Sequence, residues 1–294
     1  MQYISAFLKY LEFERRNSQH TITSYQCDLK QFCEFLSEEG IDSWNNVTSK
    51  IIRSWMVEML DQGISARSVN RKIATLKTFC KFLMREGILE DNPTERVITP
   101  KISKKLPSFI KESDMDLLLD EVSFGEGYEA CRDKLIIDVF YFTGMRLAEL
   151  VGLKISQVDL SGGVIKVLGK RNKERIVPIT RELKLAIERY LNVRRESFPG
   201  VSTDVLFLTE KGLPAYSKLV YRIVNKYLKL VSTVNKKSPH VLRHTFATAL
   251  LNRGADLNAI KEILGHSSLA ATEVYTHNTF EKLNTIYKQA HPRA

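Results

Sequence analysis

The composition of this 294-residue chain is that of a basic, folded protein. Its 44 Lys and Arg residues exceed its 34 Asp and Glu residues, which gives a net charge of +10 at pH 7 and points to a polyanionic partner, nucleic acid before membrane. No apolar run approaches the roughly 20 residues of a membrane span, and the N-terminus lacks the basic and apolar regions of a secretory signal. We therefore expect a cytoplasmic protein without membrane segments.

Cysteine and histidine usage argues against a metal site. The four cysteines, Cys27, Cys33, Cys80 and Cys131, lack CxxC spacing and are expected to be reduced. Five of the six histidines fall in the last 55 residues, which indicates where the chemistry lies. Zinc is the obvious alternative explanation of that cluster, but no HExxH motif or nearby cysteine partner supports it.

Residues 1–97 are predicted to be helical, because apolar residues recur at helical spacing. The first helix carries Ile4, Phe7, Leu8 and Leu11. Thr21 or Thr23 is expected to cap the second, a third surrounds Trp55 and ends near Gly63, and a fourth runs from about Ser65 to Arg85.

The fourth helix carries many cations that we expect to point away from the core. They are Arg67, Arg71, Lys72, Lys77 and Lys81, together with Asn70. Such a face can lie along a DNA groove and neutralise phosphates. A merely solvated charged face is the alternative, and it is the commoner case on charge alone.

Residues 98–107 are predicted to be a linker to a second domain, 108–294. The stretch has two prolines, three lysines and no helical period. A basic linker between two lobes can cross the DNA backbone, as in a C-shaped clamp.

The second domain begins with two predicted helices, over Glu112–Val122 and Arg132–Phe142. Arg146 follows the sharp Thr143–Gly144 turn at the start of another helix. Three short strands then predict a small antiparallel sheet, over 155–160, 164–168 and 175–179. Lys170 lies at the tip of its second hairpin, and Lys173 lies there as well.

Later helices are predicted over 180–195, 216–230, 240–253 and 257–264. A short strand is expected at 205–208, and a further helix carries Tyr275. The tail, 280–294, has an apolar helical face that needs a partner, either its own domain or a neighbouring subunit.

An anion site is indicated at the start of the helix that follows Ser238. Pro239 suits the first helical position, and His240 and Arg243 share one face of the first turn. An imidazole, a guanidinium and free backbone N–H groups that converge there suit a phosphate. Taken alone, the HxxR pattern fits an anion site and an ordinary helix start with polar residues about equally well.

Five separated motifs in order resemble the tyrosine recombinase (phage integrase) family, and within it the Xer recombinases. They are Arg146, Lys170, His240-x-x-Arg243, Gly265-His266 and Tyr275. The resemblance covers the whole chain. It implies a mainly α fold with a small antiparallel β-sheet, in which a helical core-binding domain and a catalytic domain form a two-domain, C-shaped DNA clamp.

The resemblance also implies roles for the catalytic residues. Tyr275 is the nucleophile that forms a 3′-phosphotyrosyl bond, and Tyr287 and Tyr227 are weaker candidates because neither follows a Gly-His by nine residues. Arg146, Arg243 and His266 would stabilise the charge on the phosphorane. Lys170 is assigned as general acid, with Lys173 as the alternative, and His240 as general base. No cofactor is implied.

A Xer-like enzyme would act on double-stranded DNA as a homo- or hetero-tetramer, possibly with a second Xer-type recombinase. In relatives the tail docks on the neighbouring protomer. Resolution of chromosome or plasmid dimers at cell division and activation by a septal DNA translocase are expectations of the resemblance alone. The alternatives are an integrase or invertase of a mobile element, a type IB topoisomerase, and a non-catalytic architectural DNA-binding protein.

Overall fold

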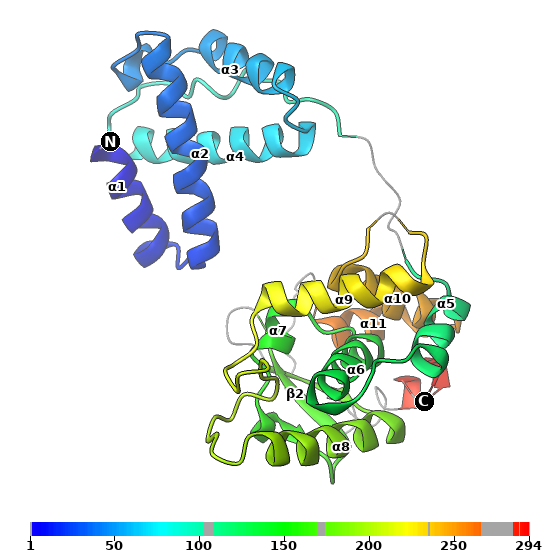
Figure 1. The fold of residues 1–294 in the computed structure, drawn as a ribbon. Coiled ribbons are helices and arrows are strands. Elements are labelled where there is room, and N and C mark those ends of the chain that lie inside the picture. The colour runs from blue at the N-terminus through cyan, green and yellow to red at the C-terminus, as the bar shows by residue number, and fades with distance from the viewer. Residues whose placement is uncertain are drawn as a thin grey trace. The chain divides into compact units, whose positions relative to one another are not determined.

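The computed structural model describes residues 2–102, 109–169, 174–234, 236–265, 285–287 and 289–293. The fold is mainly helical with one small antiparallel sheet, as the sequence predicted (Figure 1). The chain divides into two compact units, Met1–Lys105 and Leu106–Ala294. Each has its own apolar core, and the two cores share no residue among those described. No helix of the described residues is long and apolar enough to cross a bilayer.

The N-terminal unit is a bundle of helices around an aromatic core. Phe7, Phe32, Trp55 and Phe79 are buried there, and Phe32 and Trp55 have ring centroids 4.8 Å apart. The helices are α1 (Gln2–Lys9), α2 (Gln19–Glu38), α3 (Ser49–Asp61) and α4 (Ala66–Arg85), with a π-helical turn at Tyr10–Glu14 and a 3₁₀ turn at Trp44–Asn46.

Short polar side chains set where these helices begin. Ser18 caps α2, Thr48 caps α3 and Ser65 caps α4, each by accepting a hydrogen bond from a backbone N–H in the first turn. The expectation that Thr21 or Thr23 caps the second helix was wrong, because Ser18 starts the helix earlier. Both threonines lie inside α2.

One basic residue of α4 does not lie where the sequence suggested. Lys72 is only 6% exposed, and its ammonium pairs with the buried Asp28 carboxylate of α2 at 3.4 Å and bonds the Gln31 amide oxygen. The expectation that Lys72 points away from the core was therefore wrong. Arg67, Arg71 and Lys77 are exposed as predicted.

The C-terminal unit is built around α6, a helix that is buried on nearly all sides. In Figure 1, α6 runs through the middle of this unit, and it contacts α8, α9 and α10. The helices are α5 (Glu112–Asp116), α6 (Gly127–Thr143), α7 (Leu147–Val151), α8 (Arg181–Ser197), α9 (Ser217–Val231), α10 (Pro239–Asn252) and α11 (Leu257–Leu264), with a π-helical turn at Leu117–Glu121 and a 3₁₀ turn at Ile155–Gln157.

The sheet has the strand order β1-β2-β3, and both pairings are antiparallel. Its strands are β1 (Val158–Asp159), β2 (Val164–Leu168) and β3 (Glu174–Pro178). The first strand is shorter than predicted, since residues 155–157 form a 3₁₀ turn. The strand expected at 205–208 forms only isolated bridges, Lys154 to Val205 and Leu208 to Pro214.

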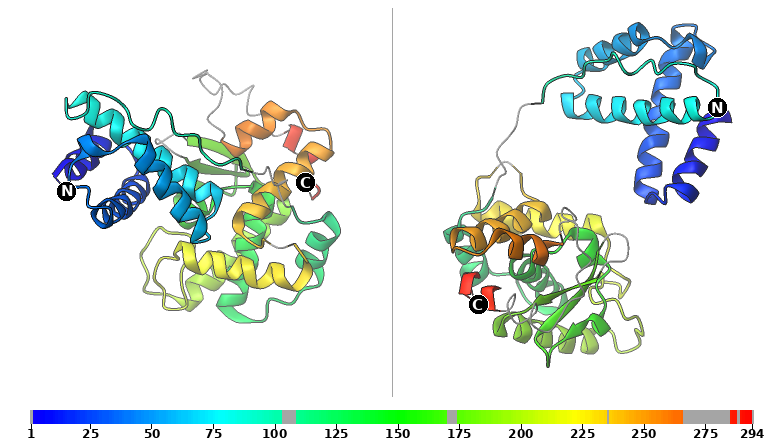
Figure 2. Two further views of the ribbon diagram at one scale, coloured as in Figure 1. Left: turned by 90° about the horizontal axis from the view of Figure 1, so that it is seen from above. Right: turned by 180° about the vertical axis from the view of Figure 1, so that it is seen from behind.

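Helix α11 connects the sheet to α10. It contacts both β3 and α10, and the views in Figure 2 place these elements together in the C-terminal unit. Gly265, with φ at +65°, ends α11 in the left-handed conformation, as Gly144 at +58° ends α6. These two glycine turns are far apart in sequence but lie close together in the C-terminal unit.

The described end of the tail packs on its own unit. The Tyr287 hydroxyl donates to the Phe142 carbonyl at 2.8 Å, and His291 is 3% exposed among aromatic rings. Arg293 forms ion pairs with Asp116 and Asp120. In this single chain, the described part of the tail thus packs within its own unit.

Candidate active site

The first turn of α10 presents the residues expected to bind an anion. Pro239 is its first residue and Ser238 precedes it, as the sequence predicted. His240 is exposed, whereas Arg243 is only 5% exposed. The rings of His240 and His244 lie 4.4 Å apart, centroid to centroid. This turn therefore offers an accessible imidazole above a buried guanidinium.

Arg243 and Arg146 converge on the C-terminal end of α11. The Arg243 guanidinium donates to the carbonyls of Gly144, at 2.6 Å, and Leu264, at 2.7 Å. Arg146, the residue before α7, donates from Nη2 to the Gly265 carbonyl at 2.9 Å. The structure thus brings together two cations that are 97 positions apart in the sequence.

A shared carboxylate holds Arg146 in place, and sequence reasoning missed it. Glu149 accepts hydrogen bonds from both the backbone N–H and the guanidinium of Arg146, each at 2.8 Å. Its two oxygens also accept from Arg175 on β3, at 2.8 and 3.0 Å. The R-x-x-E spacing at a helix start is a capping-box pattern that could have identified Glu149. Arg175 carried a signal too, because it shares the inward face of its strand with Val177.

The electrostatics of the cluster suit a site for an anion. Burial, followed by the nearby charge of Arg146, lowers the pKa of Arg243 to about 10, so the residue stays charged at neutral pH. Burial raises the pKa of Glu149, but the bonds from Arg175 and Arg146 outweigh it, so the net shift is downward and the carboxylate is ionised. Three guanidinium groups against one carboxylate leave an excess of positive charge.

The second histidine of this turn, His244, favours its neutral form. Burial, and then the proximity of His240 and Arg243, lower the pKa of His244. A neutral imidazole is able to accept a proton, which a general base requires. Sequence reasoning gave the role of base to His240, the exposed member of the pair.

Three of the predicted catalytic residues lie outside the described residues: Lys170, His266 and Tyr275. His266 follows Gly265 directly in the chain, and Lys170 follows Gly169, the last described residue after β2. The two weaker candidates for the nucleophile are both described. Tyr287 is 1% exposed and Tyr227 is 2% exposed, and burial raises the pKa of both phenols. Neither can reach a DNA phosphate without unpacking the core.

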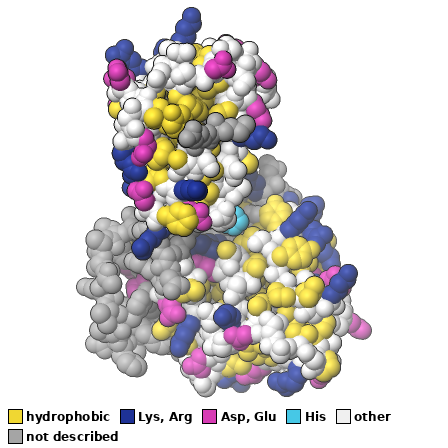
Figure 3. Space-filling model, turned by 90° about the vertical axis from the view of Figure 1, so that its left-hand side faces the viewer, with side chains coloured by type: hydrophobic (Ala, Val, Ile, Leu, Met, Phe, Trp, Pro, Cys, Tyr) yellow, Lys and Arg dark blue, Asp and Glu magenta, His cyan; other side chains and the backbone are white. Residues whose placement is uncertain are grey.

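Helix α9, which precedes α10 in the chain, carries a basic face. Lys218, Arg222, Lys226 and Lys229 are exposed on it. Figure 3 shows Lys and Arg side chains interspersed with hydrophobic ones on one face of the C-terminal unit. These residues suit contacts with a phosphate backbone.

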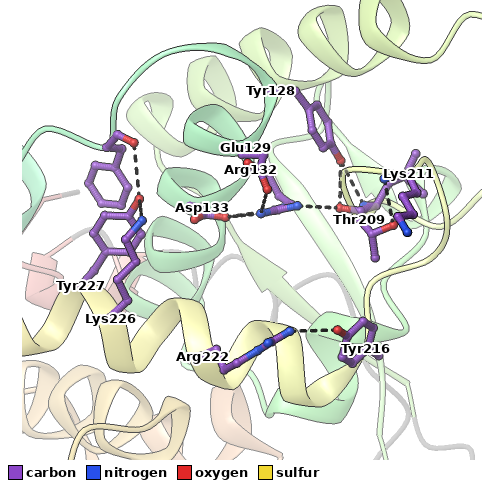
Figure 4. A network of polar contacts seen from close by, with 12 residues as sticks. Tyr128, Glu129, Arg132, Asp133, Thr209, Lys211, Tyr216, Arg222, Lys226 and Tyr227 are labelled. Carbon is purple, nitrogen blue, oxygen red and sulfur yellow. Dashed lines mark hydrogen bonds and ion pairs between the residues drawn. The ribbon is translucent and has the colours of Figure 1, made fainter.

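Tyr227 joins α9 to the rest of the unit, and further polar contacts lie on α9 and α6 (Figure 4). The Tyr227 hydroxyl bonds the Phe124 carbonyl at 3.4 Å, and Arg222 donates to the Tyr216 hydroxyl at 2.9 Å. On neighbouring α6, the buried Arg132 pairs with Asp133 at 2.8 Å.

The described residues hold no group of three or more His, Cys, Asp and Glu side chains arranged for a metal ion. The late histidines that the structure describes lie in two places. His240 and His244 flank the arginine cluster, whereas His291 is packed in the tail.

Two family models match the chain. The phage integrase family matches residues 108–282, and the phage integrase N-terminal SAM-like domain matches residues 4–87. Together they cover most of both compact units.

Known recombinases resemble the chain over its whole length. The tyrosine recombinase XerC of Chlorobaculum parvum is 40% identical over 320 residues, which cover 100% of this chain and 95% of that protein. The tyrosine recombinase XerD of Staphylococcus haemolyticus is 37% identical and covers 99% of each chain. Among solved structures, the XerH site-specific recombinase in a post-cleavage complex with palindromic difH substrate matches with a TM-score of 0.72 and 25% identity, over 98% of this chain and 82% of that one.

Proposed function

Because the chain belongs to the phage integrase family, we propose that it is a site-specific tyrosine recombinase that cuts and rejoins DNA. The observation that carries the proposal is the convergence of Arg146 and Arg243 at the end of α11, beside the first turn of α10. Two guanidinium groups fixed in this way can offer paired donors to the non-bridging oxygens of one phosphodiester.

The proposed reaction needs no external energy source. The Tyr275 phenolate oxygen attacks phosphorus while the bond to the 5′-oxygen breaks, so the phosphodiester energy is kept in a 3′-phosphotyrosyl bond. His240 takes the phenolic proton, and Lys170 donates a proton to the leaving 5′-oxygen. Arg146, Arg243 and His266 stabilise the negative charge of the phosphorane. Attack by the 5′-hydroxyl of a partner duplex reverses the step and leads to a Holliday junction.

Sequence-independent DNA contacts are assigned to the exposed cations of α4 and α9. Arg67, Arg71 and Lys77 on α4 are exposed, and so is the basic face of α9. The N-terminal unit is proposed to act as the core-binding domain, residues 1–97, and residues 108–294 as the catalytic domain. Lys72 lies buried behind this surface, so any contact that it makes with DNA requires its pair with Asp28 to open.

The biological role that fits best is dimer resolution by a Xer-type system. Relatives of the chain include proteins named XerC and XerD. This agrees with a tetramer on DNA that is built either from this chain alone or from this chain and a second Xer-type recombinase. Activation by a septal DNA translocase, action in the cytoplasm and exchange of tails between protomers stay predictions of the resemblance. Recombination of a mobile element uses the same residues and is the alternative.

Covalent trapping tests the reaction class directly. A nicked duplex that carries the host's candidate chromosomal resolution site is incubated with wild type and with Tyr275→Phe, with and without a partner recombinase. We expect a protein–DNA band on a denaturing gel for wild type and none for Tyr275→Phe, with duplex binding unchanged. If wild type binds but forms no covalent band on this site and on a mobile-element end, the architectural alternative is favoured.

A further inference from the structure

Arg175 is the third arginine that grips the end of α11. Its Nε donates to the Ile263 carbonyl at 2.8 Å, while Arg243 and Arg146 bond the next two carbonyls, of Leu264 and Gly265. The last carbonyls of a helix have no partner within the helix and form the negative end of its dipole. The last two carbonyls of α11 and that of Gly265, which ends the helix, are therefore each bonded by a different arginine.

Arg175 reaches this end of α11 from the sheet. It lies on β3 opposite Val167 of β2, is 6% exposed, and sends its remaining donors to Glu149. Gly265 lies so close that a Cβ at this position would stand 3.2 Å from both Cδ and Nη1 of Arg175. One side chain thus joins β3, the first turn of α7 and the last turn of α11.

The geometry of Arg175 requires an arginine. Nε points to α11, and the two terminal nitrogens meet both oxygens of Glu149, a planar fork that a lysine cannot reproduce. The arrangement also shares the negative charge of Glu149 between two arginines. Glu149 contacts Arg146 and Arg175 together, so its single negative charge does not fully neutralise Arg146.

We propose that Arg175 is a positioning residue for DNA cleavage, which keeps Glu149 and the end of α11 in place so that Arg146 and Arg243 hold the scissile phosphate. This inference rests on the proposed recombinase activity. Without Arg175, Glu149 pairs with Arg146 alone, and the Ile263 carbonyl loses its donor. The first change reduces the positive charge that Arg146 presents to the phosphate, and the second loosens the end of α11.

The test compares cleavage on two substrates. Arg175→Gln and Arg175→Lys are measured in single-turnover covalent-complex formation on the nicked duplex and on the same duplex with a methylphosphonate at the scissile position. The methylphosphonate carries no negative charge and depends less on correctly held cations. We expect Arg175→Gln to cleave the phosphate about 100-fold more slowly than wild type, with Arg175→Lys between them and duplex binding within threefold. On methylphosphonate the deficit should shrink at least tenfold.

Arg194→Gln is the matched control, because it removes another buried arginine of the same unit. Arg194 on α8 is 8% exposed and donates to the carbonyls of Thr203 and Val205, away from Glu149 and α11. It should lower the melting temperature without the substrate-dependent deficit. Should Arg175→Gln fail to fold, Arg175→Lys carries the comparison.

The two proposals fail in different ways. Cleavage by Arg175→Gln within threefold of wild type, or an equal deficit on both substrates, overturns the role of Arg175 and leaves the recombinase proposal intact. Absence of any covalent complex with wild type overturns the proposed function itself, and this inference with it.

Discussion

Gly265 is a residue at which both backbone and packing demand glycine. Its φ of +65° lies in the left-handed region, and a Cβ would press on the Arg175 guanidinium. Gly254, which follows α10, has a φ of +80° but no atom within 4 Å of such a Cβ. A comparison of alanine substitutions at the two positions therefore separates backbone strain from side-chain crowding.

We predict that Gly265→Ala is more harmful than Gly254→Ala. Gly254→Ala should lower the free energy of unfolding by about 1 kcal/mol, the cost of a left-handed alanine. Gly265→Ala should cost about 1 kcal/mol more and slow cleavage about 100-fold, because Arg175 must move. Urea unfolding and covalent-complex rates measure the two effects. Equal losses of stability and normal cleavage in both variants would show that Arg175 gives way freely.

The residues that sequence reasoning misjudged at this scale are charged residues with distant partners. Lys72 fits the apolar spacing of α4, but its charge was taken as a sign of exposure, and its partner Asp28 lies 44 positions earlier. Arg175 was missed for the same reason, since Glu149 is 26 positions away. Arg146, His240 and Arg243 were singled out from local motifs, and their catalytic roles, like those of Lys170, His266 and Tyr275, stay predictions.

Helices α2 and α4 meet around a buried carboxylate. Asp28 of α2 is 2% exposed and contacts Arg71, Lys72 and Thr75 of α4. A buried ion pair with several hydrogen bonds is destabilised strongly when one partner is removed. Asp28 therefore holds Lys72 within the bundle and orients Arg71 toward the surface.

We predict that Asp28→Asn destabilises the N-terminal unit by about 3 kcal/mol, because Lys72 keeps its buried charge without a counterion. Both tryptophans, Trp44 and Trp55, lie in this unit, so tryptophan fluorescence of the full chain during urea unfolding reports on it alone.

The controls for Asp28→Asn separate buried from exposed charge. Arg71→Gln removes a side chain that is 48% exposed and should cost less than about 1 kcal/mol. Adding Lys72→Met to Asp28→Asn should restore most of the lost stability. A double variant as unstable as Asp28→Asn would show that the unpaired charge is not the cause.

Elements with strong periodicity were the most predictable ones. The bounds of α4 and β2 agree with the sequence, because capping residues and alternation mark their ends. The 3₁₀ turn at Ile155–Gln157 and the π-helical turns at Tyr10–Glu14 and Leu117–Glu121 were not predicted. These depend on tertiary contacts, such as the bond from the Ile155 N–H to the Asp204 carbonyl at 2.7 Å.

At the scale of the whole molecule, the tail is attached through a histidine that must be neutral. The Arg293 N–H donates to His291 Nδ1 at 3.1 Å, and Nε2 lies 3.4 Å from the Tyr141 carbonyl. Both contacts are satisfied together only when Nε2 alone carries a proton. Burial lowers the pKa of His291 to about 4; the Tyr141 carbonyl opposes this shift, and the charges of Arg253 and Arg293 add to it.

We predict that acid weakens docking of the tail. The released tail binds a proton near pH 6.5 and the docked tail only near pH 4, so docking is fully stable above pH 6.5 and weakens as the pH falls. Between pH 7.5 and 5.5 the docking equilibrium should fall about tenfold. Hydrogen exchange at the amide of residue 291, which donates to the Tyr287 carbonyl, measures this change after correction for the intrinsic rate.

His291→Phe is the control, because it cannot titrate. Other charged groups near the tail remain in the variant: Asp116, Asp120 and Glu182 around Arg293, Arg253, and Asp138 with Lys134 on α6. Burial raises the pKa of Asp138 to about 6, so this residue titrates in the same range with the opposite sign. An identical pH response in His291→Phe and wild type would assign the effect to those groups.

The three arginines at the end of α11 bond backbone carbonyls, which every amino acid possesses. Ile263 and Leu264 can therefore drift among apolar residues of similar size without loss of the three acceptors, whereas no residue but arginine can replace all donors at 146, 175 and 243. Saturation mutagenesis with selection for recombination should show this asymmetry. Positions 263 and 264 should tolerate apolar substitutions, whereas positions 146, 175 and 243 should tolerate none. The contact should thus constrain the identity of the arginines alone, and no covariation between the arginines and the helix residues is expected.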